Sequence, residues 1–131
     1  FSVEDILARV LWGEAEGEGA DGMQAVGNVI MNRVERDSKY DADAQDIVME
    51  YKQFSSVGDP KRLEAMMNLS KDNPEYIQAL EISKKLLAGE MEDITGGATH
   101  FYNPKTAAKH SWIDEYPVTF KLKNHWFAKG N

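Results

Sequence analysis

The first stretch of the chain alternates apolar and polar residues with the period of an α-helix. This pattern predicts an amphipathic helix over residues 3–16, with Ser2 as its N-cap. Gly17 and Gly19 follow and are expected to end the helix. Its apolar stripe consists of Val3, Ile6, Leu7, Val10 and Leu11.

A second helix is predicted over residues 22–36. Asp21 and Gln24 form the Asp-x-x-Gln signature of a helix start. Gly27 inside this helix costs about 1 kcal/mol relative to Ala, so we expect close packing there, against the first helix. The expected buried positions are Met23, Val26, Ile30 and Val34.

Three further helices are expected in the middle of the chain, over residues 43–50, 60–69 and 74–88. The stretch 51–58 is expected to be a loop. Asp-Pro and Asn-Pro pairs open the last two helices, and Gly89 ends the third. The apolar side of that third helix is expected to carry Ile77, Leu80, Ser83, Leu86 and Leu87.

After a Gly-Gly pair the pattern changes to one typical of strands. A short strand is predicted over residues 98–102, then a hairpin of residues 118–122 and 125–128 with its turn at 123–124. The chain contains no internal repeat. We therefore predict a single α+β, mostly α domain over residues 1–131, with five helices and a small C-terminal hairpin or sheet.

The charge balance argues against nucleic acid as the main partner. The net charge is −7, from 22 acidic and 15 basic side chains. The C-terminal segment 99–131 differs, because it holds 5 lysines, all 3 histidines and 7 of the 13 aromatic residues. Such a segment suits a polar, ring-shaped, anionic ligand, although aromatic side chains also simply pack small sheets. No apolar run is long enough to predict a membrane span.

Several classes of site are absent or disfavoured. The chain has no cysteine, and His100, His110 and His125 lack the close spacing of metal ligands. It has no P-loop and no G-x-S-x-G motif. We therefore expect no metal and no other cofactor. No signal peptide is recognisable, and the lack of an initiator Met is consistent with a processed start.

Glu14 is the leading catalytic candidate. It lies four residues after Val10 and seven after Leu7, so it continues the apolar stripe of the first helix. A carboxyl group against Leu and Trp side chains is costly to ionise, which predicts a raised pKa and suits a general acid. The alternative is a solvated acid near a helix end, which we expect of Glu16 and Glu18.

A second carboxylate is the usual companion of such an acid in glycoside cleavage. Glu16, Glu18 and Asp21 are close to Glu14 in sequence. The glycines at 17 and 19 leave their positions open, so the residues alone name no partner.

An ordered series of short motifs runs from about Ile6 to Lys129. It comprises Ala8-Arg9, Gly13-Glu14-Ala15, Gly17-Glu18, Gly22, the run Ala25–Val34, Gln53-Phe54-Ser55, the block from Gly96-Gly97-Ala98 to Phe101-Tyr102-Asn103-Pro104, Trp112, and His125-Trp126-Phe127. Together these motifs resemble the SleB/CwlJ cell-wall hydrolase family.

The resemblance implies a lysozyme-like fold related to lytic transglycosylases, and cleavage of peptidoglycan between N-acetylmuramic acid and N-acetylglucosamine. It implies that Glu14 is the catalytic residue, through the family's Gly-Glu-Ala motif. Family members in spore germination form a 1,6-anhydromuramic product. That chemistry requires no second carboxylate, because the sugar's own 6-hydroxyl attacks, and activity should fall as the pH rises through the pKa of Glu14.

The same resemblance, together with loop and strand context, suggests substrate-binding residues. A phenylalanine such as Phe54 is more often a core residue than a ligand contact, and Ser55 could donate to substrate or to Glu14, or simply cap the turn. Asn103 precedes a proline and is a good turn former. Trp112 could wedge the hairpin against the helices, and His125 could hydrogen-bond within the core. The full set of candidates is Gln53, Phe54, Ser55, Tyr102, Asn103, Trp112 and His125.

Two alternatives stay open beside a lytic transglycosylase. One is a hydrolytic muramidase that uses water, with Glu18 or another acid as base, and the other is a non-catalytic wall-binding module. Glu16, Gly19 and Trp12 depart from the family pattern and bear on substrate fine structure, including muramic lactam. We expect a monomer that acts on peptidoglycan glycan strands at the bacterial cell wall, in a spore cortex or as a phage-delivered enzyme.

Overall fold

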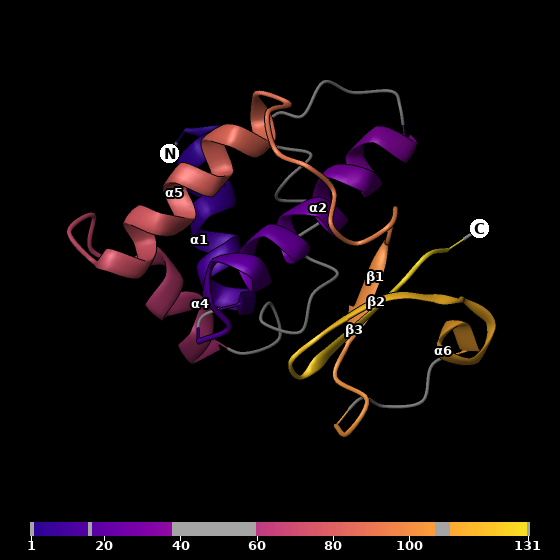
Figure 1. Cartoon of the computed structure of the whole chain (residues 1–131). Helices are drawn as coiled ribbons and strands as arrows, with labels where there is room; N and C mark the ends of the chain where they lie inside the picture. Colours follow the sequence, from indigo (N-terminus) through magenta and orange to yellow (C-terminus); the bar gives the residue numbers. More distant parts are fainter. Residues whose placement is uncertain (1, 16, 38–59, 107–110, 131) are drawn as a thin grey trace.

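The computed structural model describes residues 2–15, 17–37, 60–106 and 111–130. Figure 1 shows a group of helices and a small sheet, with α2 between them. The helices are α1 (Val3–Ala15), α2 (Gly19–Asp37), α4 (Pro60–Met67), α5 (Pro74–Leu87) and α6 (Ser111–Glu115), and the strands are β1 (His100–Tyr102), β2 (Val118–Leu122) and β3 (His125–Ala128). The helix predicted over 43–50 and the loop predicted over 51–58 lie outside the described residues. In the part described, no helix is long and apolar enough to cross a bilayer.

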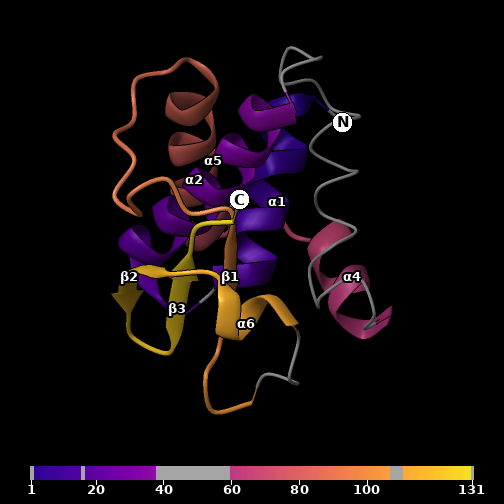
Figure 2. The same cartoon turned by 90° about the vertical axis from the view of Figure 1, so that its right-hand side faces the viewer.

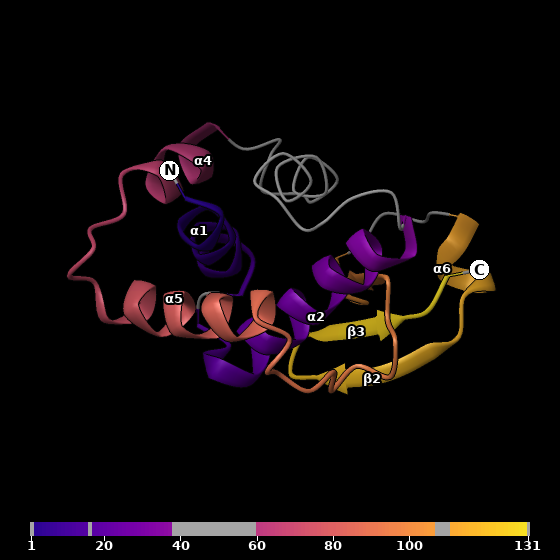
Figure 3. The ribbon, with the colours of Figure 1, turned by 90° about the horizontal axis from the view of Figure 1, so that it is seen from above.

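Helix α1 lies in the middle of the helical part, in contact with α2, α4 and α5 (Figure 3). Ser2 caps it as predicted, because its hydroxyl accepts a hydrogen bond of 3.1 Å from the Asp5 amide. The helix ends before Gly17, whose φ is +85°. Nine of its 13 residues are buried, including Ala8, Arg9 and Trp12 outside the predicted stripe. The predicted stripe lies in or against the core, and the buried surface extends beyond it because α1 contacts three other helices.

Helix α2 begins at Gly19, three residues before the predicted start. Asp21 therefore lies inside the first turn and does not cap the helix. Gln24 does not reach back to a cap either, because its amide donates to the Glu92 carbonyl oxygen at 2.8 Å. The four predicted core positions of this helix are all buried, namely Met23, Val26, Ile30 and Val34.

Gly27 is the point where α2 approaches its neighbours most closely. A Cβ atom there would overlap Leu86 of α5 and lie 3.4 Å from Leu11 of α1. The close packing predicted at this glycine is confirmed, but its main partner is α5. Helix α2 contributes to two cores, one with α1 and α5 and one with the sheet.

The ends of α5 match the prediction, and its buried face matches in part, because Ser83 and Leu86 are buried and Leu80 and Leu87 pack against the core. Asn73 accepts hydrogen bonds from the amides of Glu75 and Tyr76, and Gly89 follows the helix with φ +72°. Ile77, predicted to be buried, is 49% exposed. The helix is rotated so that its buried residues are Tyr76, Ala79, Ile82, Ser83 and Leu86.

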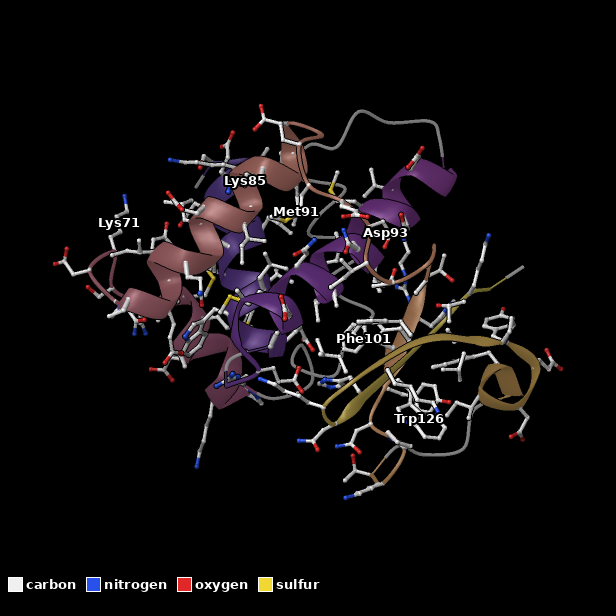
Figure 4. All side chains as sticks on the ribbon, viewed as in Figure 1. Lys71, Lys85, Met91, Asp93, Phe101 and Trp126 are labelled. Carbon is white, nitrogen blue, oxygen red and sulfur yellow. The ribbon has the colours of Figure 1, made fainter. Side chains whose placement is uncertain are left out.

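The sheet is antiparallel with strand order β1-β3-β2. The predicted hairpin of β2 and β3 is confirmed at both strands, whereas the first strand begins two residues later than predicted. One face packs Phe101, Phe120 and Phe127 towards α2, where Phe127 is 1% exposed. The opposite, outer face carries His100, Tyr102, Trp126 and Lys121, because side chains alternate along each strand. Figure 4 shows Phe101 between sheet and helices and Trp126 on the far side.

Helix α6 was not predicted. It packs beside β1 (Figure 2), where its Trp112 ring lies 5.5 Å from that of Tyr102. With only five residues, the helix is too short to show a helical period in the sequence.

A row of amide side chains on α2 holds the segment before β1, residues 92–99. Besides Gln24, Asn28 accepts a hydrogen bond of 3.1 Å from the Ile94 amide. Asn32 donates to the Ala98 carbonyl at 2.9 Å and to the Asp93 carboxylate at 3.0 Å. These residues are spaced four apart and therefore lie on one side of the helix. The row fixes the path by which the chain enters the sheet.

Candidate active site

Glu14 lies in the last turn of α1, between the buried residues Gly13 and Ala15. Its side chain is half-buried. This intermediate position fits the sequence argument, in which the carboxyl group is shielded on one side and reachable on the other. The chain turns directly after this helix, at Gly17.

The last carbonyl groups of α1 are bonded from outside the helix. Arg62 of α4 donates to the Gly13 carbonyl oxygen from Nε at 3.2 Å and from Nη2 at 3.0 Å. Nη2 also lies 3.5 Å from the Trp12 carbonyl oxygen, and the guanidinium carbon lies 4.6 Å from the centre of the Trp12 ring system. The Ala15 carbonyl oxygen accepts from the Glu18 amide at 3.0 Å. The backbone is thus held on both sides of Glu14.

Gly13 brings α4 close to this turn. A Cβ atom at residue 13 would overlap the side chain of Met66, which is 2% exposed and lies one helical turn after Arg62. The absent side chain at Gly13 therefore permits the approach that Arg62 needs to reach the α1 carbonyl groups.

Glu18 was predicted to lie on a solvated face, but in the structure it does not. Its two carboxylate oxygens lie 2.7 and 2.8 Å from Nδ1 of His125 on β3, and its side chain is 12% exposed. Lys123, in the hairpin turn, donates to the Glu18 carbonyl oxygen at 2.7 Å. Glu16 lies outside the described residues. Glu18 therefore ties the hairpin to the turn that follows Glu14.

His125 belongs to the helix-facing side of the sheet. Its ring meets Phe101 edge to face, with centroids 5.3 Å apart. The interpretation of His125 as a residue bonded inside the protein accounts for these contacts. A direct role in binding substrate stays a prediction.

Tyr102 and Trp112 come together in an aromatic cluster on the outer face of the sheet. Trp112 also lies 4.7 Å from His100 and 6.1 Å from Tyr116, measured between ring centroids. Tyr102 meets Trp126 at 6.2 Å, and the ammonium group of Lys121 lies 4.1 Å from the centre of the Trp126 rings. This cluster combines flat apolar surfaces with a positive charge, which suits a sugar ring bearing an anionic substituent.

The remaining candidates divide into one with a local contact and three that are not described. Asn103 accepts a hydrogen bond of 2.9 Å from the Lys105 amide and so forms an Asx-type turn, as the alternative interpretation proposed. Gln53, Phe54 and Ser55 lie outside the described residues.

Metal binding finds no support in the part of the chain that the structure describes. No group of three His, Asp or Glu side chains there could hold an ion. Burial raises the pKa of Asp93, but hydrogen bonds from Thr95, Asn32 and the Gly97 amide outweigh burial and lower the pKa. It is a local structural acid that orders its loop.

Arg62 is the main contact that sequence reasoning missed. It is 48 positions from Glu14, and nothing in its local pattern predicts a contact with another helix. The signal that could have found it is indirect. Helix α1 has no basic residue in its last turn, so its negative end requires a cation from elsewhere.

The chain has the lysozyme-like fold. It combines mostly helices with a small antiparallel sheet and carries a half-buried acid at the end of its central helix. The sequence profile of the Cell Wall Hydrolase family matches residues 17–128, and the chain belongs to this family. The match starts three residues after Glu14.

The most informative relatives are spore proteins. A spore cortex-lytic enzyme of Bacillus cereus is 30% identical over 98% of this chain and 46% of its own length. One from Halalkalibacterium halodurans is 28% identical over 98% of this chain and 36% of its own length. The chain thus spans less than half the length of these curated relatives.

Two solved structures are similar over the whole fold. The catalytic domain of the germination-specific lytic transglycosylase SleB from Bacillus anthracis has a TM-score of 0.70 and 29% identity, covering 98% of this chain and 97% of that one. The catalytic domain of the Bacillus cereus SleB protein has a TM-score of 0.71 and 29% identity, covering 98% and 92%. Both similarities extend over 98% of this chain, whereas the family profile begins after α1.

Proposed function

We propose that this chain cleaves the glycan strand of peptidoglycan between N-acetylmuramic acid and N-acetylglucosamine, as a lytic transglycosylase. The observation that carries the proposal is the half-buried Glu14, held at the end of the central helix. The similarity to SleB catalytic domains over 98% of the chain supports it. The substrate is peptidoglycan, and the site of action is the bacterial cell wall.

Glu14 first acts as an acid. Its carboxyl group donates a proton to the oxygen that bridges the two sugars, the bond from C1 of the muramic residue to that oxygen breaks, and the N-acetylglucosamine end leaves as an alcohol. A positively charged, oxocarbenium-like C1 develops as the bond breaks.

Glu14 then acts as a base. The 6-hydroxyl oxygen of the same muramic residue bonds to C1, and the Glu14 carboxylate accepts the hydroxyl proton. The product is a 1,6-anhydro ring, no water is consumed, and the carboxyl group is again protonated. One acid therefore completes the cycle.

The bonding of the Glu18 carboxylate to His125 favours the lytic transglycosylase over a muramidase that uses water. A hydrolytic route needs a second carboxylate to activate water. Glu18 follows Glu14 by four positions in the sequence, and both its carboxylate oxygens face Nδ1 of His125. These bonds explain Glu18 as a structural residue that holds the hairpin to the turn between α1 and α2.

The test is the pair Glu14→Gln and Glu81→Gln. Glu81 is an exposed acid on α5 and provides the matched control. We expect Glu14→Gln to lower the release of soluble glycan from cell-wall sacculi by about 10³-fold, with an unchanged melting temperature, because the proton donor is lost. Glu81→Gln should behave as wild type.

The products decide between the chemistries. Mass spectrometry of the digested glycan should find ends lighter by one water than the reducing sugar. Reducing ends would favour the muramidase. Binding to sacculi without any cleavage would favour the wall-binding module.

A further inference from the structure

We infer that Arg62 is a positioning residue for Glu14, and that α4 is the element that sets the catalytic end of α1. The inference rests on the proposed role of Glu14. The guanidinium group of Arg62 contacts the carbonyl oxygens of Trp12 and Gly13 and the Trp12 ring.

The first step of the argument is geometric. The Arg62 guanidinium bonds the peptide carbonyl immediately before Glu14, twice, at 3.0 and 3.2 Å. A planar fork with two bonds to one oxygen and a ring against its face fixes both position and orientation. The Cα of Glu14 is attached to that peptide, so a shift of the turn moves the carboxyl group with it.

The second step is electrostatic. The last turn of a helix exposes carbonyl oxygens that together amount to about half a negative charge. Helix α1 supplies no cation of its own there, and Arg62 brings one from α4. The arginine therefore stabilises the turn that carries the acid without placing a cation on α1 itself.

The third step is a comparison within the same helix pair. Arg9 of α1 donates from Nη1 to the carbonyl oxygens of Met66, Met67 and Leu69, at 2.8, 3.1 and 3.2 Å. Arg9 thus binds the last carbonyl groups of α4, just as Arg62 binds the last carbonyl groups of α1. Both arginines hold one helix to the other, but only Arg62 does so beside Glu14. Arg9 is therefore the natural control.

The experiment compares Arg62→Met, Arg62→Lys and Arg9→Met, and uses Arg62→Ala to test rescue by added guanidinium ion. Met keeps much of the apolar stem and removes the donors, and Lys keeps the charge but loses the fork. The substrate is a soluble oligosaccharide of alternating N-acetylglucosamine and N-acetylmuramic acid. Each variant is assayed at the same interval below its own melting temperature, so that folded protein is compared with folded protein.

We expect Arg62→Met to lower kcat by about 10- to 100-fold with KM nearly unchanged, because a misplaced acid affects the reaction more than binding. Arg62→Lys should fall between Met and wild type. Addition of guanidinium ion at millimolar concentration to Arg62→Ala should restore part of the lost kcat. Arg9→Met should lower the melting temperature while kcat stays at the wild-type value.

Two outcomes overturn the inference, and they differ from failure of the proposed function. Wild-type kcat in Arg62→Met, with Glu14→Gln inactive, would show that Arg62 does not position the acid. An equal fall of kcat in Arg9→Met would show a general effect of a loosened α1–α4 pair. If Arg62→Met does not fold, wild-type kcat in Arg62→Lys has the same meaning. Full activity of Glu14→Gln would instead remove the proposed catalytic role itself.

Discussion

The two ends of α1 differ in how completely their charged groups are enclosed. Asp5, in the first turn, is 8% exposed, and Nε of Arg9, which lies in the middle of the helix and is 5% exposed, is 3.0 Å from the Asp5 carboxylate. The same carboxylate oxygen accepts a 2.6 Å hydrogen bond from the Tyr76 hydroxyl. Near the end of the helix, Glu14 and Arg62 are only half-buried, whereas the Glu18 side chain just beyond it is 12% exposed, close to the 11% of the Asp5 side chain.

The difference separates structural acids from candidate catalytic ones. Asp5 is a buried carboxylate whose partners lie on α1 and α5, and it joins these two helices. Glu14 remains within reach of solvent at the same helix's other end. Burial alone therefore does not mark a catalytic acid. Incomplete burial at the edge of the core, on a backbone held from both sides, is the more specific feature.

The largest stability effect should come from the enclosed end. Asp5→Ala leaves Arg9 buried without its carboxylate, so we expect the free energy of unfolding to fall by about 3–5 kcal/mol. Glu18→Ala at the other end should cost about 1–2 kcal/mol, because its partner His125 can still meet water. Urea denaturation of both variants measures the comparison. Equal losses would show that the two ends are held alike.

Substitution of Gly13 or Gly27 should lower stability by a smaller amount, and the two variants should differ in catalysis. Gly13→Ala presses on Met66 of α4, and Gly27→Ala presses on Leu86 of α5. In each case overpacking of about 1–3 kcal/mol should exceed the gain of about 1 kcal/mol in helix propensity. Both variants should therefore melt earlier than wild type.

Only one of these glycine variants should change catalysis. Gly13→Ala displaces α4 from the turn before Glu14 and should lower kcat, whereas Gly27→Ala should leave the kcat of folded protein unchanged. A matched loss of kcat in both would contradict the role given to α4.

The smallest effect is a pH dependence at the enclosed end. Burial, then the hydrogen bond to Asp5 and the charge of Asp5, raise the pKa of Tyr76 to about 12, against an opposing effect of Arg9. The unfolded tyrosine ionises near pH 10. The stabilising contribution of Tyr76 is therefore complete below about pH 10 and is lost as the pH rises towards 12.

Tyr76→Phe isolates this contribution. The variant should be less stable than wild type by about 1 kcal/mol at neutral pH, through loss of one hydrogen bond. The gap should shrink between pH 10 and 12, which thermal melts at several pH values can measure. A constant gap over that range would contradict the raised pKa of Tyr76.

Local patterns predicted the elements well where the determining residues are neighbours in sequence. Asn73 and Gly89 bound α5 as predicted, and the hairpin turn at residues 123–124 is confirmed. The predicted position of Ile77 was wrong because Tyr76 and Ile77 belong to two overlapping apolar faces of α5. Only packing against α1 decides which of the two faces is buried. The start of α2 was wrong because Gln24 bonds Glu92 and not the helix end.

The candidate site was predicted in part. Glu14 could be named because its stripe and its motif are local. The partner of Glu18 is 107 positions away and Arg62 is 49 positions from Gly13, so no periodicity connects them. Such contacts follow from how helices and sheet come together.

The amide row on α2 has a consequence for the segment that it holds. Residues 92–99 form neither helix nor strand, yet the backbone amide of Ile94 bonds a side chain of α2, and those of Thr95, Gly97 and Ala98 bond side chains within the segment itself. Hydrogen bonds of this kind slow the exchange of amide protons as regular structure does. A stretch that a cartoon draws as plain coil can therefore be as rigid as the strand it leads into.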